Sequence, residues 1–219
     1  MALDRLCPTL MHEHVFILDP GALASFGTHF GESYWDEEAR VADAIAQLRA
    51  LREAGIETIV DSLVAAAAVE TGAPVMVHTH GAAQTGVPAL ETLVGHGVDP
   101  RRIVVAHAGD SNDLDYLRAI AESGASLGCD RFNIEHFNPD DDRIRTLVAL
   151  VEAGYLDRIH LGHDAATFHD FMIGNPLFAD EHPSYLHIST RILPRLLEAG
   201  LTQAQIDEIL VANPRRFFA

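Results

Sequence analysis

Apolar, β-branched stretches alternate along this chain with segments of helical periodicity, and this alternation constrains the fold more than any other feature of the sequence. Strands separated by helices are typical of βαβ units and a parallel sheet. The sequence therefore predicts a single domain over residues 1–219, with an α/β fold of about six parallel strands. The stretches expected to form these strands are residues 9–18, 56–61, 74–79, 102–107, 125–129 and 158–164.

Between these stretches, apolar residues recur at helical spacing, and glycines such as Gly55 and Gly154 stand where the helices are expected to end. The resulting helices are expected at residues 36–53, 63–70, 87–97, 114–123, 141–153, 188–199 and 203–211. The remaining long segment, residues 165–186, is expected to be a loop.

The composition argues against two classes of partner. The net charge of −17 would repel phosphate backbones, so a general role with nucleic acid is not expected. No apolar run reaches the ~18–20 residues of a membrane helix, so no membrane contact is expected. The first residues do not resemble a secretory signal, and two cysteines do not make a disulfide framework. We therefore expect a cytoplasmic protein.

The first expected strand carries two histidines, His12 and His14. Successive side chains of a strand point to opposite faces, so these two imidazoles share one face. Their Cα atoms would lie about 6.5–7 Å apart, which is close enough for both rings to bind one cation. The alternative is a pair of buried, hydrogen-bonded histidines on an ordinary strand.

Further potential ligands stand at the ends of later strands, where parallel α/β folds collect their functional residues. His78 ends the third expected strand, His107 the fourth and Asp164 the sixth. Imidazole and carboxylate groups suit zinc and similar divalent ions. The sequence therefore predicts that one or two divalent metal ions, with zinc as the expected metal, bind a convergent set of ligands: His12, His14, His78, His107 and Asp164.

Several motifs, in order along the chain, resemble the phosphotriesterase family of the amidohydrolase superfamily. They lie at residues 8–14, 71–80, 104–117, 127–132, 161–165 and 213–218. Within the family, the sequences Asp130-Arg131-Phe132 and His163-Asp164-Ala165 are most similar to the lactonase-like branch.

The resemblance implies a TIM-barrel (β/α)₈ fold and a hydrolase with two divalent metals, in which metal-bound hydroxide attacks a small ester, lactone or phosphotriester. It implies that His12 and His14 hold the more buried metal with Asp164, and that His78 and His107 hold the more exposed one. It also assigns catalytic roles to Asp164, which would take a proton from the hydroxide, and to Arg131, which would lie beside the substrate.

The chain departs from the family pattern in two ways. Counterparts of the third and fourth barrel strands are missing, with an apparent deletion near residues 62–66. In addition, all 15 basic residues are arginine, so the carboxylated lysine that bridges the two metals in the family has no counterpart. Asp61, which ends the second strand, is expected in a turn or cap rather than as a substitute bridge.

These departures predict an incomplete barrel with strands 56–61 and 74–79 on either side of the deletion. Its open edge allows a homodimer. They also predict at most one tightly held metal per chain. Two alternatives to a metal-dependent hydrolase stay open: a degenerate, non-catalytic family member with weak metal binding, and an incomplete gene product.

Overall fold

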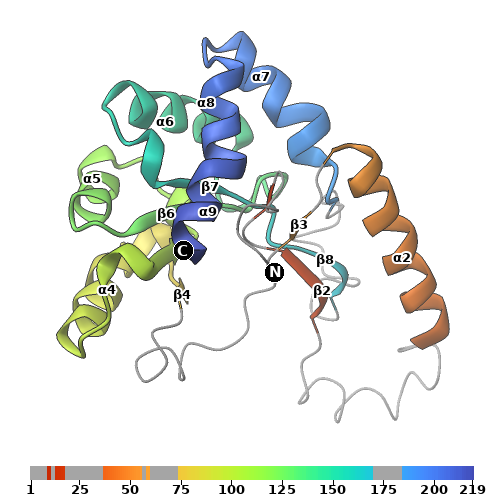
Figure 1. The fold of residues 1–219 in the computed structure, drawn as a ribbon, viewed down its shortest axis with the longest axis horizontal. Coiled ribbons are helices and arrows are strands. Elements are labelled where there is room, and N and C mark those ends of the chain that lie inside the picture. The colour runs from red at the N-terminus through yellow and green to blue at the C-terminus, as the bar shows by residue number, and fades with distance from the viewer. Residues whose placement is uncertain (1–8, 11–12, 18–36, 56–57, 60–73, 170–183) are drawn as a thin grey trace.

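The computed structural model describes residues 9–10, 13–17, 37–55, 58–59, 74–169 and 184–219 (Figure 1). Its centre is a four-stranded parallel sheet in the order β4-β5-β6-β7. Val77 of β4 lies opposite Val105 of β5, and Leu127 of β6 lies opposite Ile159 of β7. Four of the expected strands are therefore confirmed, with shorter bounds: β4 (Val75–His78), β5 (Ile103–Ala106), β6 (Ser126–Cys129) and β7 (Ile159–Leu161).

Two smaller parallel pairs complete the described strands. β1 (Thr9–Leu10) pairs with β3 (Thr58–Ile59), and β2 (Glu13–Ile17) pairs with β8 (Ala165–His169). The first expected strand therefore appears as two pieces, on either side of residues 11–12, which lie outside the described residues. The prediction of a loop from residue 165 onwards was wrong for β8, because pairing with β2 recruits a segment whose own strand signal is weak.

Helices connect the consecutive strands of the four-stranded sheet and lie around it in an arc, while α2 (Glu37–Glu53) lies on the opposite side of the view (Figure 1). The three connecting helices are α4 (Gly86–Gly95), α5 (Leu114–Glu122) and α6 (Asp140–Glu152). Short 3₁₀ turns flank them: η3 (Gly81–Ala83), η4 (Pro100–Arg102), η5 (Ala108–Asp110) and η6 (Leu156–Arg158). The helix expected over 63–70 lies outside the described residues. In the part of the chain that the structure describes, no helix is long and apolar enough to cross a membrane.

Two π-helical turns interrupt the C-terminal helices. η8 (Ile188–Ile192) leads into α7 (Leu193–Glu198), and α8 (Gln203–Asp207) continues through η9 (Glu208–Ala212) into α9 (Asn213–Phe218). Each π turn directly precedes a segment with a proline near its start, Pro194 or Pro214. Proline lacks an N–H, and its ring would clash with the carbonyl four residues earlier, so a wider turn relieves the contact. The last helix therefore continues to Phe218, beyond the end that periodicity alone predicts.

The two faces of the four-stranded sheet pack against different elements, as the period of two along a strand requires. Ile103, Val105 and Leu127 belong to the main core, which includes Leu117 and Ile120 of α5. On the other face, Val104 and Met76 pack with Phe217 and Phe218 of α9. Asn213 holds α9 at the amino end of β7, because its Nδ2 donates to the carbonyls of Leu156 and Ile159 at 2.8 and 2.7 Å. Helix α9 thus covers the amino ends of the strands, opposite the carboxyl ends where His78 and His107 stand.

Candidate active site

His107 is held in a single orientation at the carboxyl end of β5. Its side chain is fully buried, and both its backbone N–H and its Nδ1 contact the carboxylate of Asp130. The Nδ1 to Oδ1 distance is 2.8 Å. Since a carboxylate only accepts hydrogen bonds, Nδ1 donates to Asp130 and Nε2 is the nitrogen that is left to bind a metal ion. An imidazole fixed in this way is suited to bind a metal ion through Nε2.

The Nε2 atom of His107 faces two other predicted site residues. It lies 3.0 Å from Nδ1 of His78 and 3.8 Å from Oδ2 of Asp164. The two imidazole rings meet edge to face, with their centroids 4.5 Å apart. Thus the carboxyl ends of β4 and β5 and the segment after β7 bring three predicted metal ligands into one cluster.

Arg131 connects this cluster to a second carboxylate. Its Nε donates to Oδ2 of Asp164 and its Nη1 donates to Oδ2 of Asp110, both at 2.9 Å. Burial disfavours the charged form of Arg131, but the nearby charges of Asp164 and Asp110 outweigh that effect and raise the pKa of the guanidinium. The guanidinium carbon also lies 4.3 Å from the centre of the Phe137 ring, in the geometry of a cation–π contact. Arg131 is therefore a permanent positive charge beside Asp164.

Arg143 on α6 forms hydrogen bonds to the loops that carry His107 and Arg131. Its Nη2 donates to Asp110 at 2.7 Å, and its Nη1 donates to the carbonyls of Gly109 and Asp130 at 3.0 and 2.9 Å. Its Nε donates to the carbonyl of Asn138. This buried arginine thus links the loops after β5 and β6, on which His107 and Arg131 are placed.

The backbone at the site is strained and tightly packed. Three backbone φ values at the site are positive: +61° at His107, +64° at Arg131 and +55° at Asp164. These values lie in the left-handed region, which residues other than glycine rarely adopt. A Cβ atom on Gly128 would lie 2.9 Å from Cα of Ala106 and 3.1 Å from Oδ2 of Asp130. Only glycine at position 128 therefore lets the Asp130 carboxylate approach β5 and reach His107.

The other predicted ligands fall partly or wholly outside the described residues. His12 and Asp61 lie outside them, and for His14 only the backbone is described. In the pairing of β2 with β8, His14 is in register with Ala166, two residues after Asp164. Among the described residues, no group of three or more His, Cys, Asp or Glu side chains is placed to hold a metal ion by itself. The described ligands are therefore one part of the proposed metal site.

Other histidines near the site have structural roles. His80 is exposed, and its Nδ1 accepts a hydrogen bond from the N–H of Ala83. His163 is buried, and its Nε2 accepts from the N–H of Ile188 at 2.8 Å, which anchors the start of η8 to the segment after β7. Neither of these two contacts involves a predicted metal ligand.

Sequence reasoning missed Asp130, Asp110 and Arg143. Asp130 stands directly after β6, which makes it one more acid at the carboxyl end of a strand. Arg143 precedes Leu147 and Leu150 by four and seven residues, which places a charged residue on the buried side of α6. A charge on an otherwise apolar helix stripe was the signal that could have identified it.

Comparison with known proteins gives a consistent result. The model of the "Phosphotriesterase family" matches residues 62–218. A "Phosphotriesterase homology protein" of Mycobacterium tuberculosis is 28% identical over 306 positions, which cover 96% of this chain and 92% of the relative. Since this chain has 219 residues, the alignment contains a long stretch of the relative that has no counterpart here. An "Aryldialkylphosphatase" of Saccharolobus solfataricus is 32% identical, and the match covers 76% of this chain and 55% of that protein.

Solved structures show the same relationship. The phosphotriesterase from Mycobacterium tuberculosis superimposes with a TM-score of 0.88 at 25% identity, covering 100% of this chain and 95% of the other. The organophosphorus hydrolase from Deinococcus radiodurans gives a TM-score of 0.85 at 25% identity, with 100% and 94% covered. Four parallel strands with their helices, on a chain shorter than these relatives, form an incomplete version of a TIM barrel. The chain belongs to the phosphotriesterase family.

Proposed function

We infer that this chain is a metal-dependent hydrolase that cleaves a small ester, with a lactone or a phosphotriester as the substrate class. The observation that carries this inference is the orientation of His107: its Nδ1 is bound to Asp130, and its Nε2 faces His78 and Asp164. A buried histidine with a structural role alone would not need its second nitrogen directed at two further potential ligands.

The described donors suit one divalent ion. Two nitrogens bound to one tetrahedral zinc at ~2.0–2.1 Å lie about 3.3–3.4 Å apart, and the His78 and His107 nitrogens are 3.0 Å apart, so a small shift of one ring suffices. In the proposed site this pair would hold the more exposed ion, and His12, His14 and Asp164 would hold the more buried and more tightly bound one. When bound, the ion supplies Lewis acidity, which polarises an ester oxygen and acidifies water.

The side chains of this chain then perform the remaining steps. Asp164 accepts a proton from the attacking water while the oxygen of that water forms a bond to the carbonyl carbon or the phosphorus. The bond to the leaving oxygen breaks, and that oxygen receives the proton from Asp164, so a lactone becomes a hydroxy acid. Arg131 keeps Asp164 in place through the Nε to Oδ2 hydrogen bond, and Asp130 keeps His107 in place.

Metal content and turnover of the purified chain test this proposal together. We expect at most one tightly held metal per chain, because there is no lysine to bridge two ions. We expect hydrolysis of a lactone or a chromogenic phosphotriester at a rate well below that of a complete family member. His12→Ala or Asp164→Ala should abolish this turnover, and His78→Ala should reduce it less.

The exposed Asp115→Asn substitution on α5 is the matched control and should have no effect on turnover. Two tightly bound metals per chain, or a larger loss from His78→Ala than from Asp164→Ala, would contradict the proposed division of roles. The alternative is a non-catalytic family member. It is favoured by the missing lysine, and a protein that folds and binds metal without turning over either substrate would establish it.

A further inference from the structure

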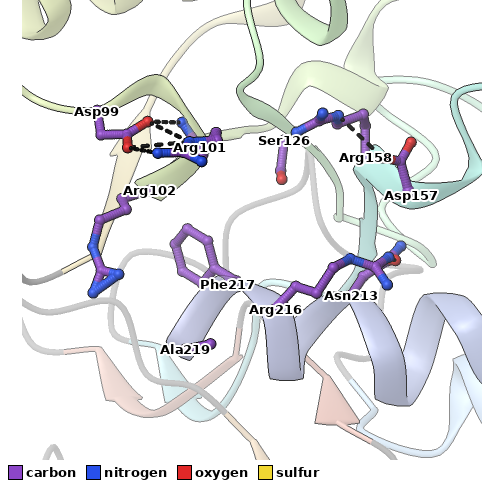
Figure 2. A pocket seen from close by; sticks show the side chains of 10 residues that line it. All are labelled: Asp99, Arg101, Arg102, Ser126, Asp157, Arg158, Asn213, Arg216, Phe217 and Ala219. Atoms are coloured by element: carbon purple, nitrogen blue, oxygen red, sulfur yellow. Dashed lines mark hydrogen bonds and ion pairs between the residues drawn. The ribbon is translucent and has the colours of Figure 1, made fainter.

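A cavity of about 440 Å³ lies at the amino ends of the strands, at the opposite end of the sheet from His107 and Asp164. Its wall includes the residues directly before β5 and β7, the first residue of β6, and the final helix α9 (Figure 2). The volume falls within the ~300–1,000 Å³ of typical small-molecule sites. The proposed hydrolysis does not use this end of the molecule, although the motif at residues 213–218 contributes Asn213, Arg216 and Phe217 to the wall.

The wall of the cavity is rich in arginine, although the chain as a whole has a net charge of −17. Arg101, Arg102, Arg158 and Arg216 line it, together with only two acidic side chains, Asp99 and Asp157. Asp99 accepts hydrogen bonds from the Arg101 guanidinium through both of its oxygens. Together with Glu208, which pairs with Arg216, three acids stand against four arginines, so a small positive excess remains at the wall and favours an anionic occupant.

The arginines have donors beyond their existing contacts. Arg158 donates from Nη1 to the carbonyl of Gly124 at 2.7 Å, and its Nε lies 3.5 Å from Asp157. Arg216 pairs with Glu208 at 2.7 Å. Since a guanidinium has five N–H donors, each keeps N–H groups that these contacts do not use. Figure 2 shows Arg102 and Arg216 extending on either side of the Phe217 ring.

Ser126 provides a second and independent indication of a ligand. The residue is only 6% exposed and lines the cavity. Its hydroxyl points into the cavity in Figure 2 and makes no hydrogen bond to any residue in the described part of the chain. The oxygen is not among the buried side-chain atoms that lack a partner, so it is accessible from the cavity. A hydroxyl directed into an arginine-lined cavity is suited to donate to an anionic oxygen.

We propose that this cavity is a binding site for a small organic anion, a carboxylate or phosphonate-type oxyanion with an apolar body. The Ser126 hydroxyl and the guanidinium groups of Arg158 and Arg216 bind the anionic head. The apolar body packs on the ring of Phe217, which lines the same cavity. This site goes beyond the proposed hydrolysis, and it exists whether or not the chain is an active enzyme.

Calorimetric titration with two probes tests the site. Phenylphosphonate carries both parts of the expected ligand, cannot be hydrolysed as an ester, and should bind with 1:1 stoichiometry. Methylphosphonate has a similar head without the ring and should bind more weakly. Ser126→Ala and Arg158→Gln should each weaken phenylphosphonate binding by about tenfold, as expected for a lost hydrogen bond to a charged group. Arg118→Gln on α5, outside the cavity, is the charge-matched control and should bind like the wild type.

Thermal unfolding provides a second measurement of binding. Because the Ser126 hydroxyl faces the cavity, where water can satisfy it, ligand-free Ser126→Ala should unfold within about 2 °C of the wild type. The same variant should gain less from added phenylphosphonate. Absence of binding by wild-type protein, or equal binding by wild type, Ser126→Ala and Arg158→Gln, would overturn the proposal.

Discussion

Asp130 is the residue on which the orientation of His107 depends, because one carboxylate accepts from both the backbone N–H and the ring of the histidine. Asp130→Asn replaces one oxygen with an NH₂ group that cannot accept, so the histidine loses its fixed tautomer. We expect a loss of about 10–100-fold in metal affinity or in kcat/KM, as is typical when the partner of a metal-binding histidine is changed. Titration with metal and steady-state kinetics measure the two effects.

The exposed Asp115→Asn is again the control for this experiment, since Asp115 lies on the surface of α5. If Asp130→Asn keeps the wild-type metal affinity and the wild-type kcat/KM, Asp130 only stabilises the fold and does not position His107.

His160 predicts a pH dependence of stability. The side chain is buried on β7, and its Nδ1 has no hydrogen-bond partner among the described residues. Burial, assisted by the charge of Arg216, lowers the pKa of this imidazole from 6.5 to about 3. The unfolded chain takes up a proton near pH 6.5, whereas the folded protein excludes it until about pH 3. The contribution of His160 to stability is therefore complete above pH 6.5 and is lost as the pH falls through this window.

His160→Phe should flatten this dependence, because phenylalanine keeps the aromatic contact with Phe217 but does not titrate. Between pH 6 and pH 4, the free energy of unfolding should fall less steeply in the variant, by up to about 1.4 kcal/mol per pH unit. Denaturant unfolding at several pH values measures the slope. The exposed His96→Gln should leave the slope unchanged, and an equal slope in wild type and His160→Phe would refute the assignment.

At the scale of elements, α6 is joined to the site by the buried Arg143, which donates to three carbonyls and to Asp110. Arg143→Met removes all of these donors and leaves the buried Asp110 with one arginine partner instead of two. We expect a loss of about 3–5 kcal/mol in the free energy of unfolding, as for other buried ion pairs from which one partner is removed. Arg145→Met, at an exposed position on the same helix, should change it by less than about 1 kcal/mol.

Denaturant titration of both variants measures these changes in the free energy of unfolding. A similar small effect for Arg143→Met and Arg145→Met would show that packing of the apolar stripe of α6 alone holds the loops after β5 and β6.

The strands, helices and site contacts differ in how far the sequence alone predicts them. Strand β5 follows most directly from the sequence, because its continuous apolar run Ile103–Ala106 is buried on both faces. Strands β4, β6 and β7 follow from shorter apolar stretches between helices. The alignment of His78, His107 and Asp164 at strand ends follows from that layout. The contacts of Asp130 and Arg143 could not be predicted, since they depend on loop conformations that no periodic pattern encodes. β8 depends on its partner strand, and the extension of α9 depends on a π turn before Pro214.

For the whole molecule, metal binding should couple to folding. The described candidate ligands come from the ends of β4 and β5 and from the segment after β7, so an ion bound between them stabilises only the folded chain. Removing a metal present at 100 times its dissociation constant costs about 2.7 kcal/mol. We therefore expect a chelator to lower the unfolding midpoint by about 5–10 °C and added zinc to restore it.

Differential scanning calorimetry with and without the chelator measures this shift. The doubly substituted His12→Ala, His14→Ala chain, which lacks two ligands of the tightly held metal, is the control and should respond less to the chelator. A midpoint that does not change when the wild type is chelated would show that no metal is bound in the folded protein.

The left-handed backbone at His107, Arg131 and Asp164 has a consequence for how this sequence can vary. Glycine adopts such φ values without steric cost, and asparagine does so more readily than most residues, whereas other side chains cost roughly 1–2 kcal/mol. Loss of the two ion pairs of Arg131 would cost more than this strain, so a library of variants selected for heat resistance alone should keep Arg131 and accumulate asparagine at positions 107 and 164. A library selected for turnover should retain histidine and aspartate there, so the two selections would favour different residues at these two positions.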